Sequence, residues 1–198
     1  MTVLYWAVMA INGIFIGMLF LFLNFNIDIG AARVGLIPSF IGYYFMFKGL
    51  SEVKELSDRF VKIVPFVTGM IVYSGILYTM DLFGFSTEID FMYGTRTSGT
   101  IIAILGFVSV ILSLYISYNI IMGIKDIEVV KEQSLNSKQL YSIWKLMAVL
   151  SFLTFALLLA QIPVLAIVSI ITNFVVMIYY LYAFNKARKL FNEQKFLI

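Results

Sequence analysis

Residues 146–185 read LMAVLSFLTFALLLAQIPVLAIVSIITNFVVMIYYLYAFN and contain no charged side chain. About 20 apolar residues in a helix span the hydrocarbon core of a bilayer, so this stretch is about twice as long as one crossing needs. The sequence AQIP at residues 160–163 predicts a break, because proline fits the first turn of a new helix and glutamine is costly at the bilayer midplane. The stretch therefore predicts a hairpin of two membrane helices, at residues 139–160 and 163–185.

The remaining uncharged runs lie upstream of this hairpin and predict four more membrane helices. The first, third and fourth helices are expected at residues 3–25, 63–83 and 97–124, with Pro65 in the first turn of the third. The second helix is expected within residues 29–50.

The uncharged part of the second helix is short, since residues 34–47 reach only about 21 Å at 1.5 Å per residue. Two arrangements are open. In the one we favour, Arg33 and Lys48 extend their side chains toward the two membrane surfaces. In the other, the helix begins at Pro38 and the chain before it folds into the outer leaflet.

The composition agrees with membrane insertion, because 62% of the 198 residues are hydrophobic and 13% are charged, whereas a soluble domain has about half and a quarter. We therefore predict an all-α polytopic membrane bundle of six helices in one transmembrane domain, residues 1–198. The chain has no cysteine or histidine, which excludes disulfides, thiolate nucleophiles and Cys/His metal sites of its own. No catalytic motif is present, so we expect neither an enzyme nor a cofactor.

Lysine and arginine are distributed unevenly along the chain. Twelve lie beside connections that share one side of the predicted bundle, and only Arg33 and Arg96 lie on the other. Basic residues favour the cytoplasmic side, so both termini are expected there. The basic net charge thus reflects the orientation of the chain in the membrane. We expect the lipid bilayer as a partner and no nucleic acid. Frequent Ile, Phe, Lys, Asn and Tyr indicate a bacterial plasma membrane.

Three short segments align without gaps: GLSEVKEL from Gly49, GIKDIEVV from Gly123 and AFNKARKL from Ala183. They predict that the even-numbered helices continue past the membrane and form three helical hairpins of one design. The positive-inside bias alone would produce part of this pattern. In the first segment, Glu55 is spaced for i,i+4 pairing with Arg59.

The segment FNIDIGAARVGLIPSFIGYYFMFKGLSEV, residues 25–53, resembles a pattern found in uncharacterised multi-pass membrane proteins of Firmicutes. That pattern has N-I-x-x-G, then L-P-D-F-I-G-Y, then G-L. Ser39 stands where the pattern usually has aspartate, so a role for a carboxylate at that position does not carry over. The resemblance implies a membrane family and no particular activity. The matching residues are Asn26, Ile27, Gly30, Pro38, Phe40, Ile41, Gly42, Tyr43, Gly49 and Leu50.

Two small residues in the first helix, Gly13 and Gly17, form a GxxxG pattern with Ala10 one turn earlier. Such a face lets another helix approach closely. The partner is expected to be either a helix of this chain or another membrane subunit.

Several polar residues fall inside the predicted helices or at their outer ends. Amides within a membrane bundle need partners, either in neighbouring helices or in a solute path. Asp81 lies near the outer end of the third helix. The segment with Asp28 and Arg33 and the loop with Glu88 and Asp90 are expected on the same side of the membrane. The predicted polar path consists of Asp81, Asp28, Arg33, Asn12, Asn119, Asn173 and Gln161.

Two kinds of function fit these features. A small-solute transporter, or the membrane subunit of a transport system, needs a polar cavity among the helices. A non-enzymatic interaction protein, such as an immunity, regulatory or assembly factor, needs only an exposed small-residue or aromatic groove.

Overall fold

The computed structural model describes residues 2–22, 26–29, 32–35, 38–83 and 96–193, and the side chains of residues 11–22, 38–83 and 104–193. Helices dominate these residues, which confirms the all-α bundle, and a short β-hairpin joins the first two helices. The elements are α1 (Thr2–Phe22), β1 (Asn26–Ile29), β2 (Ala32–Gly35), α2 (Ser39–Val53), the 3-10 turn η1 (Lys54–Leu56), α3 (Asp58–Leu82), α5 (Arg96–Lys131), α6 (Ser137–Leu159) and α7 (Pro163–Glu193).

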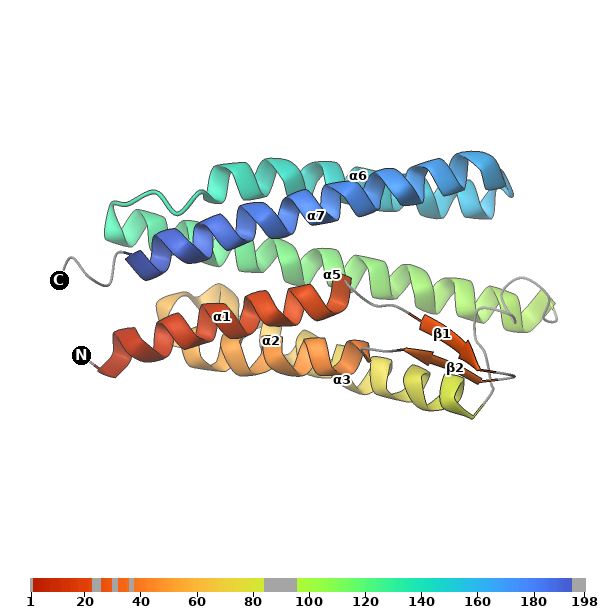
Figure 1. Ribbon diagram of the computed structural model, residues 1–198, viewed down its shortest axis with the longest axis horizontal. Coiled ribbons are helices and arrows are strands. Elements are labelled where there is room, and N and C mark those ends of the chain that lie inside the picture. Colours follow the sequence, from red (N-terminus) through yellow and green to blue (C-terminus); the bar gives the residue numbers. More distant parts are fainter. Residues whose placement is uncertain (1, 23–25, 30–31, 36–37, 84–95, 194–198) are drawn as a thin grey trace.

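The helices form a ring. Each packs against the next helix in the chain, and α7 returns to pack against α1. Helix α1 begins, and α7 ends, at the same end of the bundle, while the β-hairpin lies toward the other (Figure 1). The end that holds both termini, here called the terminal end, also holds the connections rich in lysine and arginine. The opposite end is called the hairpin end.

Four helices are long and apolar enough to cross a membrane, so the chain is an integral membrane protein. Many large apolar side chains on α7 are exposed, including Val164 at 71% and Val175 at 58%. Lipid is as apolar as these side chains, so their exposure is compatible with a membrane-embedded bundle. With 15 residues, α2 is about 22 Å long and shorter than the bilayer core, so six complete crossings stay a prediction. The four spans are residues 58–82, 104–131, 137–159 and 163–193.

The expected break between the last two helices is confirmed. Helix α6 ends at Leu159 and α7 begins at Pro163. Gln161 lies in the turn with a φ of 56°, a left-handed conformation in which a helix cannot continue. This turn lies at the hairpin end.

The favoured arrangement of the second helix is wrong. Helix α2 begins at Ser39 after Pro38, so Arg33 and Lys48 do not lie at the two ends of one helix. Proline cannot donate a backbone hydrogen bond and disfavours a helical conformation at the residue before it. The preceding chain forms the antiparallel pair β1–β2, in which Asp28 is opposite Arg33. The alternative start at Pro38 is thus confirmed.

The third helix begins earlier than expected. Helix α3 starts at Asp58, with Ser57 as its N-cap, so Pro65 lies inside the helix and its placement in the first turn is wrong. The turn η1 separates Glu55 from this helix, and the proposed i,i+4 pair of Glu55 with Arg59 is wrong as well. Arg59 Nε instead lies 3.1 Å from Asp126 Oδ2 in α5.

The three aligned segments share a pattern of burial at the terminal end. In each of the three aligned segments, the residue after the small first residue is buried, and so is the residue three positions later. Helices α5 and α7 continue to Lys131 and Glu193 as the alignment predicts. The common burial pattern supports three hairpins that end alike. The buried residues are Leu50 and Val53 in α2, Ile124 and Ile127 in α5, and Phe184 and Ala187 in α7.

The direction in which the bundle crosses the membrane is a prediction from the basic residues. The chain has no native cysteine, so a single introduced cysteine reports one position. Ser134→Cys, between α5 and α6, is expected to be shielded from an impermeant thiol reagent in intact cells and labelled after permeabilisation. Ser98→Cys, in the first turn of α5, is expected to be labelled both in intact cells and after permeabilisation. Labelling of Ser134→Cys from outside would contradict the orientation.

Candidate functional site

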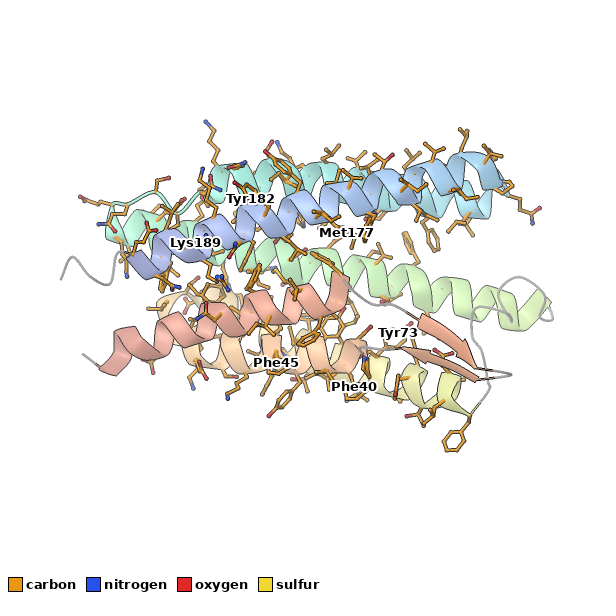
Figure 2. The ribbon with its side chains drawn as sticks, viewed as in Figure 1. Phe40, Phe45, Tyr73, Met177, Tyr182 and Lys189 are labelled. Atoms are coloured by element: carbon orange, nitrogen blue, oxygen red, sulfur yellow. The ribbon has the colours of Figure 1, made fainter. Side chains whose placement is uncertain are left out.

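A cavity of about 390 Å³ lies where α1, α2, α5, α6 and α7 meet. Met177 of α7, one of its lining residues, lies about half-way along the bundle (Figure 2). Hydroxyl and amide groups contribute the polar part of the lining, and no charged residue is among the lining residues. We call this space the central cavity. Its polar lining residues are Tyr43, Ser109, Ser113, Ser117, Ser151, Thr154 and Asn173.

Three serines on α5 form one wall of the central cavity. Ser109, Ser113 and Ser117 are spaced by four residues, which places them on one face of a helix. Ser113 Oγ lies 3.1 Å from the hydroxyl of Tyr43 in α2. Trp144 Nε1 in α6 donates to Ser117 Oγ at 3.0 Å. The serine wall therefore links α5 to both neighbouring sides of the cavity.

These serines were not among the residues expected from the sequence. A serine in a helix can donate to a carbonyl of its own preceding turn, and Ser117 Oγ does so to Ser113 O at 2.9 Å. A single serine is therefore weak evidence of a site. The four-residue spacing was the available indication, because it aligns the three hydroxyls.

Asn173 of α7 also lines the central cavity. Its Nδ2 donates to Ser151 Oγ of α6 at 3.2 Å. Its Oδ1 is buried and has no hydrogen-bond partner within the described part of the chain. A buried acceptor without a partner costs about 1–3 kcal/mol. Because neighbouring atoms cover this oxygen completely, a molecule in the cavity does not reach it in this structure.

Methionines supply much of the apolar lining. Met18 and Met46 come from α1 and α2, and Met147 and Met177 come from α6 and α7. Methionine side chains are flexible and polarizable, so they adapt to ligands of varied shape. The central cavity thus combines a fixed polar wall with adaptable apolar walls.

Aromatic rings lie between the central cavity and the terminal end. Phe22, which lines the cavity, packs edge-on against Tyr180 with ring centroids 6.1 Å apart. One turn further along α7, Phe184 stacks on Phe15 at 6.2 Å. Tyr180 and Phe184 are almost fully buried. This aromatic layer closes the cavity toward the terminal end.

The structure does not bring the predicted polar residues into one path. Asn173 lines the central cavity, but Asn119 donates to Tyr115 O of its own helix at 2.9 Å. Asn12 lines a separate groove next to Lys48 and Glu52 of α2. Gln161 is exposed in the turn between α6 and α7.

The predicted charged residues gather at the hairpin end, away from the central cavity. Asp81 is half-buried in the last turn of α3. Asp28 and Arg33 are cross-strand neighbours in the hairpin, and β2 packs against α3. None of these three residues is among the cavity's lining residues. Glu88 and Asp90 lie outside the described residues.

The GxxxG face of α1 packs within the chain. A Cβ atom on Gly17 would lie 2.6 Å from Gly42 O, and one on Gly13 would lie 3.3 Å from the Cα of Gly49. Helix α2 therefore covers this face so closely that another subunit has no access to it. Of the two expected partners, the helix of the same chain is the observed one.

No known protein family, curated protein or solved structure matches this chain. The resemblance of residues 25–53 to a Firmicutes membrane family therefore stays a prediction, and the chemistry of the central cavity is the main guide to function.

Proposed function

We propose that this membrane protein is a small-solute carrier, acting alone or as the membrane subunit of a transport system, and that the central cavity is its binding site. The observation that carries the proposal is the cavity among five helices, which hydroxyl groups line and no charged residue lines. Ligand sites in proteins typically combine an apolar lining with a few placed polar groups. The central cavity has this composition.

The alternative, an interaction protein without a solute, receives less support. Its expected docking face was an exposed small-residue or aromatic groove. Helix α2 covers the small-residue stripe of α1, whereas Tyr115, Tyr118 and Trp144 line a groove between α5 and α6. The cavity favours the carrier.

The carrier proposal is tested by accessibility of a cysteine in the cavity. In Ser113→Cys the thiol would line the cavity. In Ile111→Cys it would lie on the outer surface of the bundle, where the native Ile111 side chain is 41% exposed. A thiol must ionise to react, and lipid suppresses ionisation. We expect a small water-soluble methanethiosulfonate to label Ser113→Cys at least about tenfold faster than Ile111→Cys, a difference of about 1.4 kcal/mol in activation free energy.

A carrier must also expose its site to both sides of the membrane. Ser113→Cys is therefore expected to react in right-side-out and in inside-out vesicles, at different rates. Reaction from one side only would favour a receptor or an interaction protein. Equal, slow labelling of Ser113→Cys and Ile111→Cys would contradict a water-accessible site.

A further inference from the structure

The absence of charge from the cavity lining restricts what the carrier binds. A bound ion would need an opposite charge or several strong hydrogen bonds to offset the loss of its hydration. No lysine, arginine, aspartate or glutamate is among the lining residues of the central cavity. An uncharged molecule is therefore the better fit.

The hydrogen-bonding capacity of the lining argues against a sugar or another polyol. The hydroxyls of Ser113 and Ser117 are already engaged by Tyr43 and Trp144. Thr154 Oγ1 lies 2.7 Å from Ser169 Oγ. A polyol would bury many hydroxyl groups among lining groups most of which already have partners, and each unpaired hydroxyl would weaken binding. A molecule with one hydroxyl suffices for Ser109, the lining serine without a hydrogen-bond partner among the described residues.

The apolar walls and the volume indicate the rest of the molecule. Met18 and Met46 face the cavity from α1 and α2 and are almost fully buried. At about 30 Å³ per water-sized group, a cavity of about 390 Å³ holds about a dozen non-hydrogen atoms. A flexible hydrocarbon chain of that size fits the adaptable methionine walls.

The arrangement of α7 points to entry from the bilayer. Helix α7 has no buried residue between Ser169 and Tyr180, the stretch that carries Asn173 and Met177. Helix α1 ends part-way along the bundle, while α5, α6 and α7 continue toward the hairpin end (Figure 1). The last turns of α1 supply Met18, Leu21 and Phe22 to the cavity. The central cavity thus lies beside the last turns of α1, and α1 does not cover the bundle beyond this point.

We infer that the solute is an uncharged amphiphile from the bilayer, with an apolar chain and one hydroxyl group, and that Ser109 binds the hydroxyl. This inference rests on the proposed carrier function, because it assigns a substrate class to the same cavity. A hydroxyl can both donate and accept, so it matches the hydroxyl of Ser109 and the serine wall of which Ser109 is part.

The test uses Ser113→Cys in proteoliposomes and three probes: dodecanol, mannitol and dodecyltrimethylammonium. A ligand present at about ten times its dissociation constant protects its site about tenfold, so dodecanol should slow labelling of Ser113→Cys about tenfold. Mannitol and dodecyltrimethylammonium should leave the rate nearly unchanged. Ser134→Cys, exposed at the terminal end, serves as a control for effects on the reagent and should not respond to any probe.

Adding Ser109→Ala to Ser113→Cys should weaken protection by dodecanol about fivefold, as expected for one lost hydrogen bond. Protection by mannitol and not by dodecanol would overturn the substrate class and leave the carrier proposal standing. Labelling that no probe slows would also overturn the substrate class alone. If Ser113→Cys reacts no faster than Ile111→Cys, the carrier proposal fails first, and this inference fails with it.

Discussion

Gly17→Ala is expected to abolish most of the folded protein, because the added methyl group would meet backbone on both sides. The new Cβ would lie 2.6 Å from Gly42 O and 2.8 Å from Met46 N. Backbone atoms cannot rotate away as a flexible side chain can, so α1 and α2 would have to separate. Overpacking costs about 1–3 kcal/mol or more. The measurement is the thermal unfolding midpoint of the purified protein in detergent, together with its yield.

Gly69→Ala is the matched control for this variant. Nothing lies within 4 Å of a Cβ built on Gly69 in α3, and alanine favours a helix by about 1 kcal/mol over glycine. The midpoint should therefore stay unchanged or rise. Equal midpoints for Gly17→Ala and Gly69→Ala would contradict the close packing of α1 on α2.

Gly123→Ala is expected to destabilise the terminal end, because the ring of Phe60 lies directly against Gly123. The new Cβ would lie 2.5 Å from Phe60 Cζ and 3.0 Å from Cδ1. Phe60 is 1% exposed within the core, so its ring has little room to withdraw. We expect a loss of about 1–3 kcal/mol in the free energy of unfolding, measured by denaturant titration. Gly106→Ala in the same helix has no neighbouring atom within 4 Å and should cause no such loss.

A double-mutant cycle tests the cause of that loss. Phe60→Leu removes most of the ring and should be destabilising in the parent protein, yet it should relieve the clash in Gly123→Ala. Contacting residues typically couple by about 0.5–3 kcal/mol, so the double variant should be more stable than the sum of the single losses predicts. Additive losses would show that Phe60 does not restrict position 123.

The membrane helices and most of their boundaries could be predicted from the sequence, because bilayer insertion depends on hydrophobicity summed over contiguous residues. The break at residues 160–163 is an example, since proline and glutamine act there through local backbone and solvation effects. Helix α2 was harder to place. Its apolar run extends past Pro38 toward the amino terminus, and the favoured interpretation gave hydrophobicity more weight than the backbone restriction of proline.

The candidate site could be predicted only in part. Asn173 was expected to be functional, and it lines the central cavity. Asn12 and Asn119 had the same appearance in the sequence, but Asn119 bonds to its own helix and Asn12 faces a different groove. An amide in an apolar helix shows that a partner is needed and does not show which partner is present.

The sequence by itself determined that this chain is a membrane-embedded helical protein, because lipid acts on each helix through its own residues. The tertiary structure decided which faces of those helices meet. It placed α2 on the glycines of α1 and brought the serines of α5 and Asn173 of α7 to one cavity. Serine can bond within its own helix, and glycine fits any helix surface, so neither residue identifies its neighbour. Only the packing of helices distant in sequence makes them an interface and a cavity.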